Sequence, residues 1–234
     1  EYASWIVMGI RPGYFAAAVQ GAGGSYAAYP ASAIKDVPAW FSCGGEDTAS
    51  LPATRAGVLA LRQAGGNPIY TEYKTGDHLE GIVMPFYGPI VFEWLLSQRR
   101  GQAVGTEPLL STTSPTRHAV YSTGRSKLDL AGSAGALGET ITCVSWTNLA
   151  NNAKGIATGT NAWSVTGIPL VANKTNLIIV VGTTTSWCAA YGGNTTFNDT
   201  LTVIQSPLRA TLTLQGTNAL LPWIGGGPPS RVQR

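Results

Sequence analysis

The chain has 234 residues, a formal net charge of +3 at neutral pH and only 12% charged side chains. This small charge is evenly spread, and no run of Lys and Arg is interleaved with aromatic residues, so the sequence lacks the basic footprint of a nucleic-acid-binding protein. No stretch of about 18 apolar residues is present, which excludes a membrane-spanning helix of ordinary length. We therefore expect neither nucleic acid nor a membrane as a partner.

Helical and strand-like patterns alternate in residues 1–100. Short apolar runs bounded by glycine or proline predict buried strands, and longer runs with apolar residues at helical spacing predict helices. The expected strands are 14–19, 39–43 and 69–73, and the expected helices are 3–10, 51–64 and 90–100. Strands and helices in this order favour an α/β domain with a parallel sheet.

A different pattern begins after residue 117. Residues 101–117 are rich in Gly, Pro, Ser and Thr without a hydrophobic period, so we interpret them as a linker. Residues 118–205 hold short β-rich runs separated by turn residues, which predicts an all-β sandwich of immunoglobulin type. Its expected strands are 127–130, 140–146, 162–165, 176–181 and 199–204. Residues 206–234 are expected to open a further β-module or to form a tail.

Two polar residues follow predicted strands directly. Asp47 comes after the strand at 39–43, and His78 comes after the strand at 69–73. Open α/β sheets place their sites at the carboxyl ends of the strands, so we expect Asp47 and His78 to meet there. A carboxylate that orients a histidine is the supporting half of a nucleophilic triad. Each residue alone has a simpler interpretation, Asp47 as a helix cap and His78 as an exposed loop residue; we interpret Asp77 as a turn residue.

Residues 38–100 carry a longer pattern around this pair. After the strand come Gly44 and Asp47, then ALRQAGG, YTEY, His78 and a final WLLSQRR. This order resembles the end of the serine esterases of α/β-hydrolase type that include polyhydroxybutyrate depolymerases, feruloyl esterases and dienelactone hydrolases. The resemblance implies that Asp47 is the catalytic acid and His78 the catalytic base. The sequence departs from the group at Ser42-Cys43-Gly44, where a histidine usually precedes the glycine.

The nucleophile of that group has no match in this chain. Residues 2–19 resemble the helix and strand that follow the G-x-S-x-G turn, so the resemblance implies that the serine precedes Glu1 and that the chain is processed or truncated. Within the chain, we interpret Ser133 as part of a Gly/Ser turn and Cys43 as an inert apolar residue of a buried strand.

These interpretations predict a partial α/β-hydrolase sheet followed by an all-β Ig-like sandwich. The expected function is hydrolysis of a carboxylic ester, with a polyester or a plant-wall ester as substrate and without a metal or organic cofactor. The alternative is a non-catalytic fragment with a structural or polymer-binding role. In either case a second copy of the chain could cover the exposed sheet edge that missing strands would leave.

The β-rich half resembles Ig-like modules of secreted bacterial hydrolases in ITCVSWTN, GTNAWSVTGIPL and NLIIV. We expect Trp146 and Trp163 to fill its core. If residues 140–146 pair antiparallel with 176–187, Cys143 and Cys188 come close enough for a disulfide. That bond would indicate an oxidising compartment, and we expect a secreted or extracellular protein.

Overall fold

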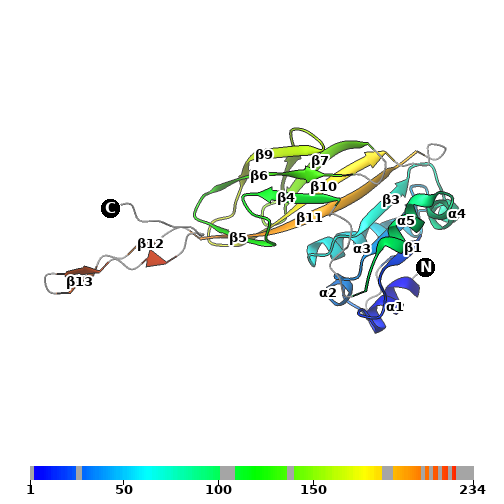
Figure 1. The fold of residues 1–234 in the computed structure, drawn as a ribbon, viewed down its shortest axis with the longest axis horizontal. Helices are drawn as coiled ribbons and strands as arrows, with labels where there is room; N and C mark the ends of the chain where they lie inside the picture. The colour runs from blue at the N-terminus through cyan, green and yellow to red at the C-terminus, as the bar shows by residue number, and fades with distance from the viewer. Residues whose placement is uncertain are drawn as a thin grey trace.

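The computed structural model describes the backbone and side chains of residues 3–24, 28–100, 109–135, 140–185 and 192–206, together with the backbone of four short strands beyond residue 206. Figure 1 shows a helix-bearing N-terminal part, a β-rich part beside it, and the short C-terminal strands projecting from the far end of the β-rich part.

The N-terminal part contains three parallel strands in the order β1-β2-β3. Every residue of the central strand β2 is buried, which explains why its side chains are mostly apolar, because helices cover both faces of a parallel sheet. Trp5 and Leu61 belong to the cluster on one face, and Trp94 packs edge-on against Trp40 on the other. The elements are α1 (Ala3–Ile10), β1 (Ala18–Gly21), α2 (Ala31–Ile34), β2 (Ala39–Gly44), α3 (Leu51–Gln63), β3 (Ile69–Tyr73), α4 (His78–Val83), the 3₁₀ helix η1 (Met84–Phe86) and α5 (Pro89–Ser97).

The β-rich part packs a three-stranded antiparallel sheet, β4-β6-β9, over strands β7, β10 and β11. Strand β9 alternates buried and exposed residues, as a half-buried strand does. Trp146 and Trp163 are 9% and 2% exposed and belong to the shared core, which confirms their predicted place. The elements are β4 (Leu110–Ser114), β5 (Val120–Thr123), β6 (Lys127–Ala134), β7 (Ile141–Asn148), β8 (Ala153–Ile156), β9 (Ala162–Pro169), β10 (Thr175–Thr185) and β11 (Asn194–Gln205).

One mixed sheet joins the two parts. Strand β11 pairs antiparallel with β3, with Thr195 opposite Thr71, so the path of the eight-stranded sheet runs β1-β2-β3-β11-β10-β7-β8, with β5 beside β11. Side chains reinforce this junction: Thr71 contacts Thr195 at 3.0 Å between their hydroxyl oxygens, and Arg62 of α3 donates to Asn198 and Thr196.

The predicted fold class is therefore wrong. The described residues are β-rich, with 42% in strands and 23% in helices, and the parallel strands continue into an antiparallel set instead of forming a partial α/β-hydrolase sheet beside a separate Ig-like sandwich. The physical reason is the outer edge of β3, which would expose unpaired backbone groups and is instead paired by β11. That pairing joins residues more than a hundred positions apart, which no local pattern can reveal.

Three smaller expectations also change. Residues 14–17 lie outside β1, which starts at Ala18. The stretch interpreted as a linker contains β4, and Ser133 lies in strand β6, paired on both sides, so it is not in a turn. Beyond residue 206 the described backbone forms β12 (Arg209–Ala210), β13 (Thr213–Gln215), β14 (Asn218–Leu220) and β15 (Trp223–Ile224), which pair as β12-β15 and β13-β14.

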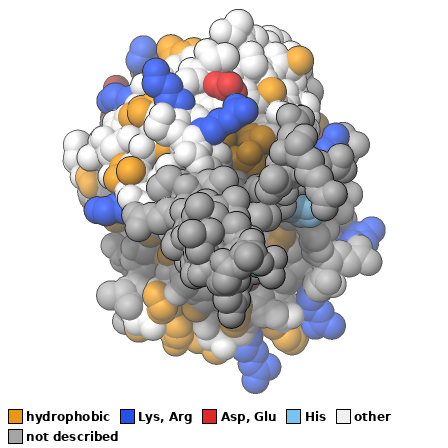
Figure 2. All heavy atoms as spheres, turned by 90° about the vertical axis from the view of Figure 1, so that its left-hand side faces the viewer, with side chains coloured by type: hydrophobic (Ala, Val, Ile, Leu, Met, Phe, Trp, Pro, Cys, Tyr) orange, Lys and Arg blue, Asp and Glu red, His pale blue; other side chains and the backbone are white. Residues whose placement is uncertain are grey.

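The distribution of charged side chains on the surface agrees with the low charge content of the sequence. Figure 2 views the end from which the C-terminal strands project, and Lys and Arg side chains are scattered over that face between hydrophobic ones. Among the described residues, no single helix combines the length and apolar character needed to span a membrane; the pair His78–Phe86 and Pro89–Ser97, bent by 66°, reaches them only together.

Candidate active site

The loops that follow β2 and β3 are tied together by their backbones. The N–H of Gly45 donates to the carbonyl of Tyr73 at 2.7 Å, and the N–H of Glu46 donates to the carbonyl of Gly76 at 3.0 Å. Gly44 also lies against the backbone of residues 76–77 so closely that a Cβ at this position would collide with it. Both loops leave the carboxyl ends of neighbouring parallel strands. The backbone bonds between the loops therefore fix the distance between the residues that they carry.

Asp47 and His78 meet at the carboxyl ends of β2 and β3. The Nδ1 atom of His78 lies 2.7 Å from Oδ2 of Asp47. The carboxyl side chain of Asp47 is 3% exposed, whereas the imidazole is 43% exposed. The pair thus combines a buried carboxylate with a histidine ring that solvent reaches, which is the arrangement of a histidine oriented for proton transfer. The expected proximity is confirmed, and the catalytic roles stay a prediction.

The second carboxylate oxygen of Asp47 accepts hydrogen bonds from the backbone. Oδ1 accepts the backbone N–H groups of Ala49 and Ser50 at 3.2 and 3.0 Å, and the next residue begins helix α3. Asp47 is therefore not the cap of α3, because the N-cap residue is Ser50 and the N–H groups that Asp47 accepts lie before the helix. One oxygen closes the loop ahead of the helix, and the other is held toward His78.

These contacts determine the charge of Asp47. Burial alone would raise the pKa of this carboxyl, but the hydrogen bonds from the Ser50 backbone and from the His78 ring outweigh burial and hold the pKa below its ordinary value. Asp47 is accordingly an anion at neutral pH. An anion at this position fixes the proton of His78 on Nδ1 and leaves Nε2 as the basic nitrogen.

His78 is positioned by the start of α4. Asp77 caps this helix, accepting the Leu79 N–H at 2.8 Å, while Glu80 accepts the Asp77 N–H at 3.0 Å. This reciprocal capping box fixes the backbone of His78, the first residue of the helix. Asp77, interpreted from the sequence as a turn residue, is the cap of this helix, and its carboxylate is engaged with Leu79.

Ser50 is the site residue that sequence reasoning missed. Its hydroxyl oxygen lies 3.3 Å from His78 Nδ1, and the side chain is buried. A serine nucleophile must give its proton to a nitrogen that accepts it, and Nδ1 already donates to Asp47, so this geometry does not make Ser50 a nucleophile. The spacing Asp47-x-x-Ser50 before a helix was the available signal, since it is typical of a loop that closes on its own backbone.

Cys43 lies beneath the carboxylate, with Sγ 3.9 Å from Asp47 Oδ2. The side chain is fully buried, and burial raises the pKa of its thiol to about 11. A protonated, inaccessible thiol is a poor nucleophile. This environment supports the interpretation of Cys43 as an inert part of β2.

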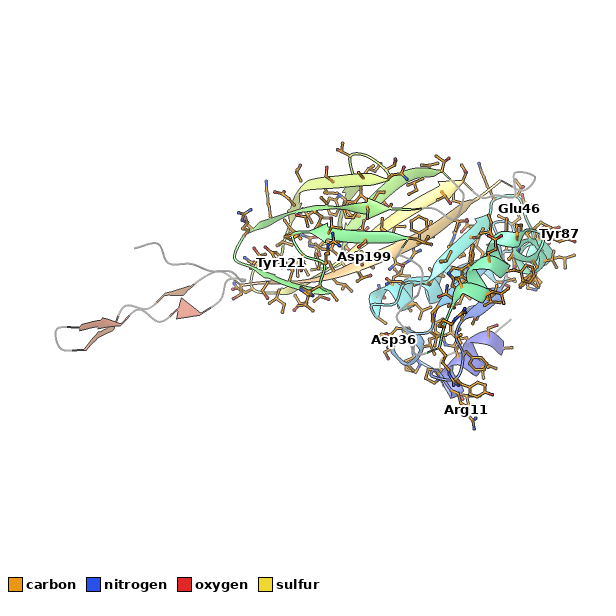
Figure 3. All side chains as sticks on the ribbon, in the orientation of Figure 1. Arg11, Asp36, Glu46, Tyr87, Tyr121 and Asp199 are labelled. Carbon is orange, nitrogen blue, oxygen red and sulfur yellow. The ribbon has the colours of Figure 1, made fainter. Side chains whose placement is uncertain are left out.

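Apolar side chains are exposed next to the histidine. Leu79 and Tyr87 are 60% and 73% exposed, and a shallow hollow of about 310 Å³ is lined by Ile82, Val83, Phe86 and Tyr87. Figure 3 shows Glu46 and Tyr87 at the same end of the N-terminal part, where the loops after β2 and β3 lie. The hollow thus lies on the helical segments that continue from His78.

The predicted disulfide is only partly covered by the described residues. Strand β7 pairs antiparallel with β10, as expected, and Cys143 lies opposite Thr183 near the end of β10. Cys143 has a free thiol in the structure, whereas Cys188 lies outside the described residues. The bond therefore stays a prediction. Among the described residues, no group of three or more His, Cys, Asp or Glu side chains could hold a metal ion.

Comparison of the chain with models of known protein families finds no match. No curated protein matches it either. The interpretation of the site therefore depends on its own geometry and on the motif resemblance described above.

Proposed function

We propose that the chain carries the acid–base pair of a serine carboxylic ester hydrolase whose nucleophile is supplied by sequence preceding Glu1. The observation that carries this proposal is the 2.7 Å contact between buried Asp47 and accessible His78. The resemblance of residues 38–100 to polyhydroxybutyrate depolymerases and feruloyl esterases adds support, because both residues stand at the acid and base positions of that motif.

The roles follow from the geometry of the ring. His78 would take the proton of the attacking serine on Nε2, and later return it to the leaving alcohol. Asp47 would hold the Nδ1 proton and stabilise the imidazolium that forms, as a buried anion in a low-dielectric environment can. Ser50 contributes a second polar contact at Nδ1, which restricts rotation of the ring. None of these steps requires a metal or an organic cofactor.

The substrate class follows from the surroundings of His78. Exposed Leu79, Phe86 and Tyr87 favour an ester with apolar portions, such as a polyhydroxyalkanoate or a feruloyl or acetyl ester of a plant-wall polymer. The β-rich part would act as a spacer or attach to the polymer. A secreted location is proposed on the low content of charged residues and on the predicted disulfide.

The decisive experiment measures p-nitrophenyl acetate hydrolysis by this chain and by a version extended with its natural upstream sequence. We expect activity only in the extended protein, and a fall of about 10³-fold or more in kcat for His78→Ala. Asp36→Asn serves as the matched control, since Asp36 is exposed and pairs with Lys35. Strong activity of the short chain that survives His78→Ala would refute the proposed roles, and no activity in either form would leave a structural or polymer-binding module.

A further inference from the structure

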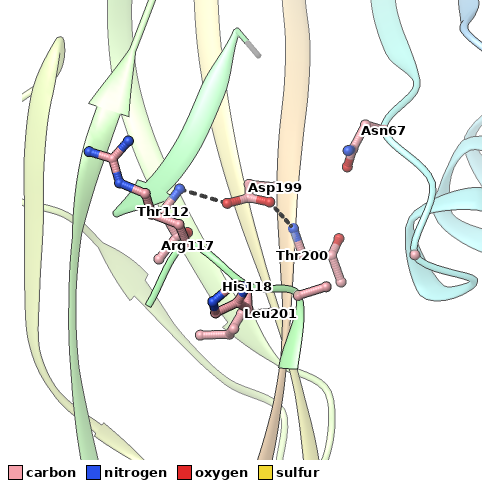
Figure 4. A pocket seen from close by; sticks show the side chains of 9 residues that line it. Asn67, Thr112, Arg117, His118, Asp199, Thr200 and Leu201 are labelled. Carbon is pink, nitrogen blue, oxygen red and sulfur yellow. Dashed lines mark hydrogen bonds between the residues drawn. The ribbon is translucent and has the colours of Figure 1, made fainter. Parts of the chain in front are cut away.

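One edge of strand β11 is interrupted between two partners. Strand β3 pairs with residues 194–196, and β5 pairs with residues 202–205 on the path beside β11. The backbone of 197–201 therefore has no strand partner on this edge. The loop that follows α3 and the loop that precedes β5 flank the gap, so segments from both parts of the molecule border it (Figure 4).

A cavity of about 170 Å³ opens at this gap. Its lining is polar, and the side chains that define its chemistry are Asn67, Thr112, His118, Asp199 and Thr200. Figure 3 places Asp199 near the junction of the two parts, away from Glu46 and Tyr87 at the candidate active site. The cavity is therefore a separate feature of the molecule.

Asp199 is held rigidly at the wall of this cavity. Its Oδ2 atom accepts the Thr112 N–H at 2.6 Å, and its Oδ1 atom accepts the Thr200 N–H at 2.9 Å, as Figure 4 shows. On β11 this carboxylate alternates with core residues Phe197 and Leu201, so an acid occupies a position where the pattern calls for an apolar side chain. Each oxygen retains a second acceptor site for a ligand.

Thr112 forms part of the wall beside this carboxylate. The residue lines the cavity and is 5% exposed, and its backbone N–H holds Asp199. Its hydroxyl oxygen is shielded from solvent and does not face the cavity, so Asp199 is the group that a ligand would meet there.

We propose that this cavity binds a small neutral compound with neighbouring hydroxyl groups, of the size of glycerol up to one monosaccharide ring. At about 30 Å³ per water molecule, the space fits a ligand of that size and no polymer segment. A preorganised carboxylate accepts two adjacent hydroxyl protons, while the Asn67 amide and the His118 ring can each donate or accept. In Figure 4 the guanidinium of Arg117 points away from Asp199, which leaves the carboxylate available to a neutral hydroxyl ligand.

Ligand-observed NMR and thermal unfolding of this chain test the proposal, with glycerol and methyl glucoside as probes and 1-propanol as the probe without neighbouring hydroxyls. We expect saturation transfer and a concentration-dependent rise in Tm with the two polyols and not with 1-propanol. Affinity should be weak, on the order of millimolar, since the site is small and depends on hydrogen bonds.

Asp199→Asn decides between ligand binding and a merely structural cavity, because it removes the charge of the carboxylate that meets the ligand. We expect polyol affinity to fall by about tenfold. Two controls should keep the wild-type affinity: Asp129→Asn, which changes an exposed aspartate that also accepts a backbone N–H, and Thr112→Val, which removes a hydroxyl that is shielded from the cavity. No polyol signal with the wild-type chain, or an Asp199→Asn signal equal to that of the wild type, would overturn the proposal.

Discussion

Gly44 and Asp77 meet backbone against backbone: a Cβ built on Gly44 would collide with the carbonyl oxygen of Asp77. Gly44 ends β2, and Asp77 caps the helix that begins with His78. A Cβ built on Gly81 of the same helix would collide with the Gly44 nitrogen. The absence of side chains at Gly44 and Gly81 therefore sets the distance between Asp47 and His78.

We expect Gly44→Ala to push the loop at 74–77 outward, because the obstructing atoms are backbone and cannot rotate away. The predicted loss of stability is about 1–3 kcal/mol, as for other overpacked sites, and the Asp47–His78 contact should be broken. Urea unfolding measures the first effect, and the Nδ1 proton resonance of His78 reports the second. Gly13→Ala is the control, since nothing lies within 4 Å of its added Cβ and a change within about 0.5 kcal/mol is expected.

The lowered pKa of Asp47 predicts how the free energy of unfolding changes with pH. Its pKa is below the ordinary 3.8 in the folded state, so the unfolded chain binds more protons as the pH falls through this region. The stability contributed by Asp47 is therefore present above its unfolded pKa and is lost as the pH falls through the folded pKa. In urea unfolding at pH 7, Asp47→Asn should be less stable than wild type, and the difference should shrink at pH 3. A constant difference at both pH values would contradict the assigned contacts.

The tautomer of His78 provides a test that does not need a complete enzyme. With Asp47 ionised, the neutral ring should carry its proton on Nδ1, which long-range ¹⁵N correlation spectra of this chain can read. Asp47→Ala should remove that preference and leave the spectrum of His118 unchanged. If His78 is protonated on Nε2 in the wild-type chain, the proposed base could not accept the serine proton.

Two arginines of α3 make a matched pair across the junction. Arg62 donates to Asn198 and Thr196 of β11, while Arg55 pairs with Glu72 and is 57% exposed. We expect Arg62→Met to cost about 1–3 kcal/mol, because neutral acceptors in a half-buried junction lose a charged donor. Arg55→Met should cost no more than about 1 kcal/mol, as exposed ion pairs do. Equal losses in denaturant unfolding would show that the β3–β11 junction does not depend on Arg62.

The thiols should differ in reactivity. Burial raises the pKa of Cys43 to about 11, so this residue should resist iodoacetamide in the native chain at pH 8. Cys143, which is partly accessible, should be labelled only after reduction if it is bonded to Cys188. Peptide mapping with and without reductant reads both outcomes. Labelling of Cys143 in unreduced native protein would rule out the predicted disulfide.

The positions of Asp47 and His78 were predictable from local sequence. Each follows a short apolar run, and the run predicted at 69–73 coincides with β3 while 39–43 matches β2 to within one residue. Such strands have a local signal, because burial on both faces requires consecutive apolar residues. Ser50 was not predicted: its spacing after Asp47 indicates only a loop that closes on its own backbone, and the folded loops bring its hydroxyl to His78.

Local sequence patterns were enough to predict the buried strands, the helices between them, the β-rich second half and the carboxylate and imidazole at two strand ends. The tertiary structure was needed to show that these strands belong to one sheet, because the edge of β3 is paired by β11 from a distant part of the chain. It also showed the gap along the edge of β11 between its partners β3 and β5, where Asp199 and Thr112 line a cavity. Hydrophobic period is a property of neighbouring residues, whereas the choice of strand partner depends on which backbone groups remain unpaired once the whole chain is packed.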